Sequence, residues 1–120
     1  MVIDIPLPEA YRLLNHGPVT LVTSAHAGAR NVMAAAWAMP LDFDPPKVAV
    51  VIDANTYTRS LVEASGEFAL NLPCAAIAAN VIKAGSASGR DTDKFVFAGL
   101  AQFPAQTIGA PLVAGCVAWL

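Results

Sequence analysis

The sequence predicts a small α+β domain that is mainly β, with short helices between its strands, and three observations support this. First, β-branched and apolar stretches such as 19–24 (VTLVTS) and 47–53 (KVAVVID) alternate with turn residues. Second, segments 58–65 and 75–84 have the length and pattern of short helices. Third, no repeat, low-complexity tract or linker divides the chain, so we expect one domain over residues 1–120. This order of elements is typical of a barrel with appended helices.

The first third of the chain predicts a helix followed by a hairpin. Residues 8–15 (PEAYRLLN) form a short helical segment that a Pro opens and an Asn-His-Gly-Pro run closes. Residues 19–24 form a strand, and 25–30 (AHAGAR) a hairpin-like connection in which Gly28 can adopt a positive φ. Residues 31–39 (NVMAAAWAM) are rich in Ala, which favours helix, but they are short and follow a hairpin signal. We therefore expect an extended strand that leads into a loop.

The middle of the chain predicts a turn, a buried strand and a helix. Residues 41–46 (LDFDPP) should form a turn, because two prolines are disfavoured within a strand ladder. Residues 47–53 should form a strand buried on both faces. Residues 58–65 (TRSLVEAS) should form a helix with Thr58 near its start and Gly66 just past its end.

The last part of the chain predicts a strand at 67–72, a helix at 75–84 and a loop at 85–94 (GSASGRDTDK). Residues 109–120 are apolar and still have the pattern of a strand where the sequence ends. An apolar strand left unpaired at an edge favours association with other chains. We therefore expect a domain that is truncated on its C-terminal side.

The composition predicts an apolar partner surface. Charged residues make up 13% of the chain and apolar residues 56%, whereas about 25% and 45–50% are typical. A second subunit, a flat cofactor or a membrane could cover such a surface. The apolar runs fall short of the roughly 20 residues that a spanning helix needs, and no signal peptide is visible, so we expect a cytoplasmic protein. A net charge of −2 gives no reason to expect nucleic-acid binding.

Cysteines and histidines provide no recognisable site. Cys74 and Cys116 lack CxxC spacing and are interpreted as free thiols in a reducing compartment, with a disulfide or redox pair as the alternative. His16 and His26 fall in loop-like stretches without metal-ligand spacing, so no metal site is expected. No nucleophile, P-loop or dinucleotide motif is present, and we expect no catalytic side chain.

The remaining candidates are polar or aromatic residues near expected strand ends, loops and a helix start: Asn31, Trp37, Asn55, Thr58 and Lys94. Together they would suit a flat amphipathic ligand with an anionic tail. Amides can bond the edge of a heterocycle, an aromatic ring can flank its face, and hydroxyls with a Lys can hold a phosphate. Each also has an ordinary structural interpretation. Asn31 could be a turn residue, Trp37 a core residue, Thr58 a helix cap and Lys94 a solvated charge.

The order of the motifs resembles a known family. The run 18–53 (PVTLVTSAHAGARNVMAAAWAMPLDFDPPKVAVVID), followed by 55–73 (NTYTRSLVEASGEFALNLP) and 88–95 (SGRDTDKF), is similar to the flavin reductase-like, FMN-binding split-barrel family, which includes the flavoredoxins. The similarity covers about residues 17–97. It implies a Greek-key split β-barrel and a homodimer with FMN near the subunit interface.

The resemblance implies that nine residues hold the flavin: Asn31, Val32, Met33, Ala34, Trp37, Asn55, Thr58, Arg59 and Lys94. The first four would line the isoalloxazine ring, partly through backbone groups, and Trp37 would lie beside it. Thr58, helped by Asn55 or Arg59, would contact the phosphate or the ribityl chain. Lys94 would add positive charge. In flavoredoxin-like members, further contacts from a His and an aromatic residue come from the part of the domain that follows residue 120 here.

The implied function is that of a flavoprotein oxidoreductase that passes electrons from NADH or NADPH through FMN to an acceptor, with the chemistry supplied by the cofactor. One alternative is an FMN electron carrier that serves redox partner proteins without its own NAD(P)H reaction. Another is a non-enzymatic barrel module that only dimerises.

Overall fold

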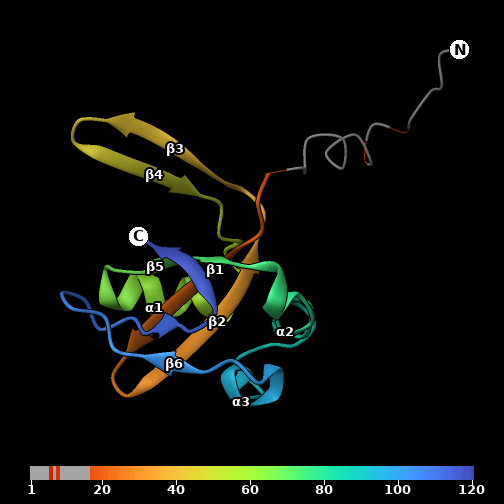
Figure 1. Ribbon diagram of the computed structural model, residues 1–120. Helices are drawn as coiled ribbons and strands as arrows, with labels where there is room; N and C mark the ends of the chain where they lie inside the picture. The colour runs from red at the N-terminus through yellow and green to blue at the C-terminus, as the bar shows by residue number, and fades with distance from the viewer. Residues whose placement is uncertain (1–5, 7, 9–16) are drawn as a thin grey trace, which may run out of the picture.

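The computed structural model describes residues 6, 8 and 17–120, so most of the helix expected at 8–15 lies outside the described residues. The α+β class, mainly strands with short helices, is confirmed (Figure 1). In chain order the elements are β1 (Thr20–His26), β2 (Ala29–Ala35), β3 (Ala38–Phe43), β4 (Pro46–Val50), α1 (Tyr57–Ser65), β5 (Ala69–Pro73), the 3-10 helix η2 (Ala75–Ile77), α2 (Ala78–Gly85), α3 (Lys94–Ala98), β6 (Gln102–Phe103), β7 (Leu112–Val113) and β8 (Cys116–Trp119). Among the helices described, none is long and apolar enough to cross a membrane.

The centre of the molecule is an antiparallel sheet with the strand order β2-β1-β5-β8. β1 lies inside this sheet, and five consecutive side chains from Thr20 to Ser24 are buried. β1 and β2 pair from Thr20 opposite Ala35 to His26 opposite Ala29. The turn between them has Ala27 at φ 49° and Gly28 at φ 82°, a conformation that matches the twist of a two-residue hairpin. The strand expected at 19–24 and the hairpin after it are thus confirmed.

Helices cover both faces of this sheet. α1 packs on β1 and β2, whereas α2 and α3 pack on β2 and on each other (Figure 1). The core cluster on the α2 and α3 side consists of apolar side chains from strands, helices and the C-terminal segments: Leu21, Val32, Val81, Ala84, Phe95, Ala98, Leu100 and Val113. The helices expected at 58–65 and 75–84 are confirmed, the second as η2 followed by α2.

The side chain of Asn71 forms hydrogen bonds that link three strands, β5, β1 and β7. It lies on β5 and is fully buried. Its Nδ2 donates to the Leu21 carbonyl oxygen at 2.8 Å and to Thr23 Oγ1 at 3.2 Å, both on β1. Its Oδ1 accepts from the Val113 backbone N–H of β7 at 2.8 Å. One side chain therefore forms hydrogen bonds with buried polar groups of two other strands. Burying an amide away from water is costly unless the amide is itself hydrogen-bonded, and here it is.

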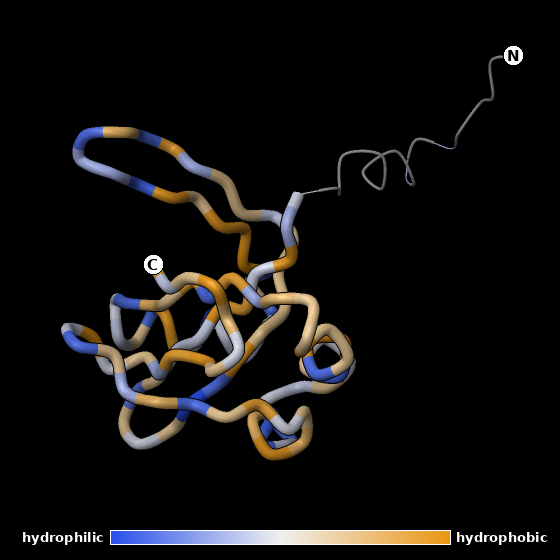
Figure 2. The backbone as a smooth tube through the Cα atoms, viewed as in Figure 1, coloured by the Kyte–Doolittle hydropathy of each residue, from blue (hydrophilic) through white to orange (hydrophobic). Residues whose placement is uncertain are grey.

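β3 and β4 form a hairpin that stands away from the central sheet (Figure 1), with hydrophobic stretches along both of its strands (Figure 2). Two expectations are corrected here. The turn expected at 41–46 is confined to residues 44–45, since β3 continues to Phe43 and Pro46 starts β4, a position that tolerates proline. The strand expected at 47–53 ends at Val50 and is not buried on both faces, because no second layer of the described chain covers it.

The C-terminal third also departs from expectation. The segment 109–120 forms two strands instead of one, because the chain turns at Gly115, whose φ is 82°. Helix α3 was not foreseen, although it carries recognisable signals. Asp93 caps its start by accepting from the Phe95 and Val96 backbone N–H groups, and Gly99 ends it at φ 66°. The helix is only five residues long, which is too short for a periodic pattern.

Replacing Asn71 by Ala should lower the free energy of unfolding by about 2–4 kcal/mol. The reason is that buried partners on β1 and β7 would lose their hydrogen bonds, each at a cost of about 1–3 kcal/mol. Urea denaturation measures this change. Asn80→Ala is the control, since this partly exposed amide donates to the Ala98 carbonyl oxygen on α3; it should cost about 0.5–1.5 kcal/mol. Equal losses in the two variants would contradict the role given to Asn71.

Candidate functional site

The structure gathers six of the nine expected site residues around one cavity of about 310 Å³. The cavity lies where β2, the start of α1, the loop after α2 and the start of α3 meet. The six residues are Asn31, Met33, Ala34, Asn55, Thr58 and Lys94. Residues that are far apart in sequence thus form one compartment with both polar and apolar walls.

Strand alternation decides how β2 contributes to this cavity. Asn31 turns toward α1, where its Nδ2 donates to Thr58 Oγ1 at 2.9 Å. The next side chain, Val32, is fully buried in the core cluster on the opposite side. Val32 therefore does not line the cavity with its side chain, and only its backbone could contact a ligand there.

The bond between Asn31 and Thr58 leaves one acceptor and one donor hydrogen of these two side chains unused. Asn31 Oδ1 is buried and accepts no hydrogen bond within the described residues. The Thr58 hydroxyl is also buried, and because its oxygen accepts from Asn31, its hydrogen can be donated elsewhere. Gly89 comes so close that a Cβ there would overlap Asn31 Oδ1 and lie 2.8 Å from Tyr57 Cδ1. The wall of the cavity therefore contains an acceptor without a partner in the described residues, next to a hydroxyl group that can still donate its hydrogen.

Lys94 supplies a positive charge at the end of a side chain that is mostly buried. Its side chain, at the first position of α3, is only 6% exposed, and no carboxylate or hydrogen-bond acceptor contacts its ammonium group in the part of the chain described. Burial lowers the pKa of Lys94 below the ordinary value of 10.5. A buried cation without a partner is costly to the folded protein. Such an arrangement is typical of a site that receives an anion, and Lys94 is not the solvated charge of the alternative interpretation.

The start of α1 differs from expectation in one respect. The helix cap is Thr56, whose Oγ1 accepts from the Arg59 backbone N–H at 3.2 Å, so Thr58 is not the cap; its hydroxyl oxygen accepts from Asn31 instead. The Arg59 side chain does not line the cavity. It forms an exposed ion pair with Glu63 at 2.6 Å.

Arg90 and Tyr57 border the site but were not singled out from the sequence. The Arg90 guanidinium donates to the Asn55 carbonyl oxygen at 3.3 Å and lies 5.7 Å from the centre of the Tyr57 ring. Tyr57 itself lines the cavity. Arg90 could have been suspected as the only cation between Lys83 and Lys94 in a loop rich in Gly and Ser.

A second hollow of about 380 Å³ adjoins the first and shares Met33, Ala34 and Thr56 with it. Its remaining lining includes Trp37 and Val51, which are 49% and 58% exposed. Trp37 is therefore not a core residue and lies at the mouth of this hollow. The two compartments together form an elongated site with a polar, cationic end and an apolar, open end.

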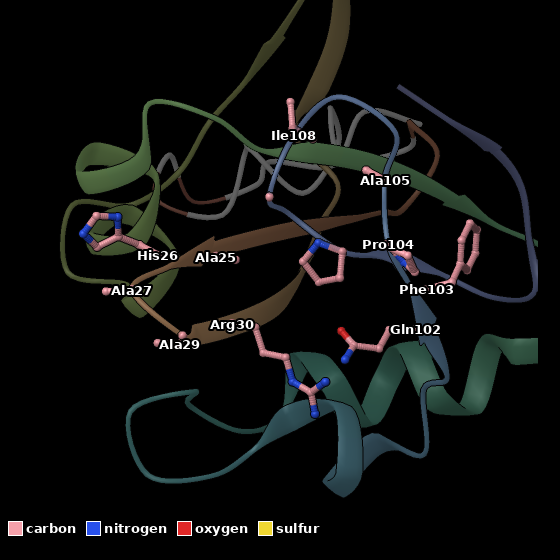
Figure 3. A pocket seen from close by; sticks show the side chains of 13 residues that line it. Ala25, His26, Ala27, Ala29, Arg30, Gln102, Phe103, Pro104, Ala105 and Ile108 are labelled. Atoms are coloured by element: carbon pink, nitrogen blue, oxygen red, sulfur yellow. The ribbon is translucent and has the colours of Figure 1, made fainter.

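A larger cavity of about 610 Å³ lies elsewhere, at the tip of the β1–β2 hairpin (Figure 3). It is lined by small residues of the hairpin and by a loop that includes Phe103 and Pro104. Apart from Arg30 and His26 its lining is uncharged, and it contains none of the nine expected site residues. Its size alone therefore does not make it the functional site.

Neither metals nor cysteines provide a further centre in the described structure. Among residues 6, 8 and 17–120, no three His, Cys, Asp or Glu side chains lie together as metal ligands. Cys74 and Cys116 are free and half-buried. Burial and, to a smaller extent, the nearby Cys74 raise the pKa of the Cys116 thiol, which lowers its reactivity.

Comparison with known proteins shows a consistent relationship. The family model described as flavin reductase like domain matches residues 12–120. The Escherichia coli (strain K12) protein YddH, described as uncharacterized, is 46% identical over 98% of this chain and 64% of its own length. The crystal structure of an FMN-binding domain of a flavin reductases-like enzyme from Shewanella baltica is 44% identical, with a TM-score of 0.83, over 98% of this chain and 62% of that one.

The flavoredoxin of Desulfovibrio vulgaris (Miyazaki F) is 34% identical, with a TM-score of 0.77, over 82% of this chain and 54% of its own. The chain thus spans less than two thirds of the length of these three relatives.

Replacing Lys94 by Met should raise the free energy of unfolding near neutral pH by about 0.5–2 kcal/mol, because a partly desolvated charge without an ion pair in the described residues is removed. In the parent, the unfolded chain binds more protons than the folded one between the lowered pKa of Lys94 and 10.5. Parent stability should therefore rise with pH through that window, and the variant should lack this rise.

Urea denaturation at several alkaline pH values measures both effects. Lys83→Met, at an exposed position of α2, is the control and should alter neither. A Lys94→Met variant that is less stable than the parent and still gains stability with rising pH would contradict the description of Lys94 as a partly desolvated cation without an ion pair.

Proposed function

This chain belongs to the flavin reductase-like domain family, and on that premise we propose that it binds FMN and acts as an oxidoreductase with NADH or NADPH as electron donor. The observation that carries the proposal is the Lys94 side chain, which is 6% exposed, lines a cavity shared with Asn31 and Thr58, and has no ion pair within the described residues. A cytoplasmic location and a redox partner protein that receives the electrons belong to the same proposal.

The polar end of the site suits the phosphate and ribityl chain of FMN. Lys94 would neutralise the phosphate, and the Thr58 hydroxyl would donate to one of its oxygens. Asn31 Oδ1, which has no hydrogen-bond partner in the described residues, would accept from a ribityl hydroxyl. Arg90 would add a second positive charge at the rim. Each unsatisfied group of the cavity thus finds a chemical counterpart in the cofactor.

The apolar end suits the flavin ring. Met33, Ala34 and the backbone of β2 would hold one side of the ring, and Trp37 would lie at its edge. FMN, when bound, supplies the hydride and electron chemistry. The protein side chains bind and orient it, and no side chain is needed as acid, base or nucleophile. The open side at Val51 leaves space for a flat nicotinamide.

We also propose that the protein forms a homodimer through the β3–β4 hairpin. A two-stranded hairpin is only marginally stable by itself and needs a third layer to cover its apolar side chains. Met39, Leu41 and Phe43 are exposed on it, and Phe43 is 97% exposed. The base of the hairpin adjoins Trp37 and Val51, which also line the site. A second copy of the chain would cover this apolar surface.

The function is tested by the visible absorption spectrum of the purified protein after incubation with FMN and removal of free flavin. Retained flavin bands together with consumption of NADH or NADPH would support a reductase. Retained bands without nicotinamide oxidation would indicate an FMN electron carrier instead. Loss of all flavin from the protein would rule out the flavoprotein proposal and leave a dimerisation module.

Thr58→Ala should weaken FMN binding by about 0.5–2 kcal/mol, which is about 2- to 30-fold in the dissociation constant. The variant loses the proposed bond to the phosphate and the bond that orients Asn31. Quenching of flavin fluorescence measures the constant, and Lys83→Ala on the exposed side of α2 serves as the control. Equal affinity of Thr58→Ala and the parent would count against the phosphate assignment.

Phe43→Ser should weaken the dimer by about tenfold or more, since buried aromatic residues contribute strongly to interfaces. Sedimentation or light scattering over a dilution series measures the monomer–dimer equilibrium. The matched control is Ile82→Ser, because Ile82 is an exposed apolar residue on α2, away from the hairpin. A parent protein that stays monomeric at high concentration refutes the dimer, and equal effects of the two variants refute the assignment of the interface.

A further inference from the structure

Two consecutive residues of β2, Arg30 and Asn31, point to opposite sides of the strand. Asn31 turns toward α1 and the cavity, whereas Arg30 extends on the other side of the strand toward α3 (Figure 3). The Arg30 guanidinium donates to Asp93 Oδ2 at 3.1 Å, and its Cζ lies 5.0 Å from the centre of the Phe95 ring. Arg30 therefore interacts with both the Asp93 carboxylate at the start of α3 and the face of the Phe95 ring in the same helix.

Asp93 uses both of its carboxylate oxygens. While Oδ2 accepts from Arg30, Oδ1 accepts from the backbone N–H groups of Phe95 at 3.0 Å and Val96 at 3.3 Å, which caps α3. Burial alone would raise the pKa of the Asp93 carboxyl, but the bonds from Arg30 and from the two backbone groups outweigh it and lower the pKa. The carboxylate thus fixes the first turn of α3 relative to β2.

Lys94 is the residue that directly follows this cap. Its ammonium group has no hydrogen bond or ion pair within the described structure, so its position follows from packing of the side chain and from the place of its backbone. Its position depends on the first turn of α3, and this turn is tied to β2 by Asp93 and Arg30. Asn31, which shares the cavity with Lys94, lies on the same strand β2 and donates to Thr58 of α1.

We propose that Arg30 is a positioning residue for an anionic ligand of this cavity. It touches no ligand itself, but acts through Asp93 to place the Lys94 ammonium opposite the phosphate of a bound flavin. This inference rests on the proposed function, that is, on binding of FMN. The Arg30–Asp93 pair is itself partly exposed, with side chains 37% and 47% accessible, so its contribution to overall stability is small. Its main effect is on binding of the phosphate group.

The test compares FMN with riboflavin, which lacks the phosphate. Dissociation constants of both are measured by flavin fluorescence for the parent, Arg30→Met, Arg30→Lys and Asp93→Asn. Arg30→Met keeps an apolar stem against Phe95 but removes the charge. Asp93→Asn keeps a good helix cap but removes the ion pair, so it remains folded if Arg30→Met does not. Lys83→Met is the control for loss of a surface charge.

We expect Arg30→Met and Asp93→Asn to weaken FMN binding about 3- to 10-fold and to leave riboflavin binding unchanged. Arg30→Lys should recover part of the loss. In a Lys94→Met background, Arg30→Met should have no further effect, because the charge that it positions is gone.

Three results would overturn the proposal. Unchanged FMN binding in Arg30→Met and Asp93→Asn would remove the positioning role while the flavin function stands. Equal losses for FMN and riboflavin, or a loss that persists in Lys94→Met, would indicate a general structural role instead. A parent protein that binds neither flavin would remove the proposed function and the positioning role together.

Discussion

The structure depends most on the buried amide of Asn71. A central strand such as β1, with side chains buried on both faces, is stable only if most of the polar groups beside it have hydrogen-bond partners; the Ser24 hydroxyl is an exception among the described residues. Asn71 bonds the Leu21 carbonyl and the Thr23 hydroxyl on β1 and receives the Val113 backbone N–H. These contacts lock the register in which Leu21 faces Asn71. β2 pairs along the whole of β1, and this second register determines which side chains of β2 face the site.

The stability of the fold favours paired polar groups, whereas binding of a ligand requires polar groups that are left without a partner in the protein. The core of this small domain is apolar, yet the wall of the cavity beside it contains the mostly buried Lys94 side chain, which has no ion pair in the described residues, and the Asn31 carbonyl oxygen, which has no hydrogen-bond partner there. Both arrangements cost stability. Local violations of the usual packing rules occur mainly where function requires them. The Arg30–Asp93 pair and the cap on α3 hold this costly arrangement in place.

The β3–β4 hairpin explains the unusual composition in a simple way. The chain has only 13% charged residues, and much of its apolar surplus lies on this hairpin and beside it, where Met39, Leu41 and Phe43 are exposed. Residues Trp37 and Val51 link its base to the apolar end of the site. A dimer interface and a flavin ring would therefore meet at these two residues, and the homodimer and the cofactor would share one continuous apolar surface.

The sequence by itself determined the α+β class, the β1–β2 hairpin, α1 and α2, because these depend on local signals such as Gly28, Gly66 and β-branched runs. It also singled out six residues that share one cavity. It could not determine which of the expected residues would line the same cavity. Val32 and Arg59 have suitable neighbours in sequence, but strand alternation buries Val32, and Arg59 pairs with Glu63 one helical turn away.

Only the tertiary structure showed that 47–53 lacks a covering layer, that Lys94 is buried without a partner, and that Arg30 reaches Asp93 across 63 positions of the chain. The physical reason is that strand and turn preferences act over a few neighbouring residues, whereas burial and charge pairing depend on which distant segments pack together.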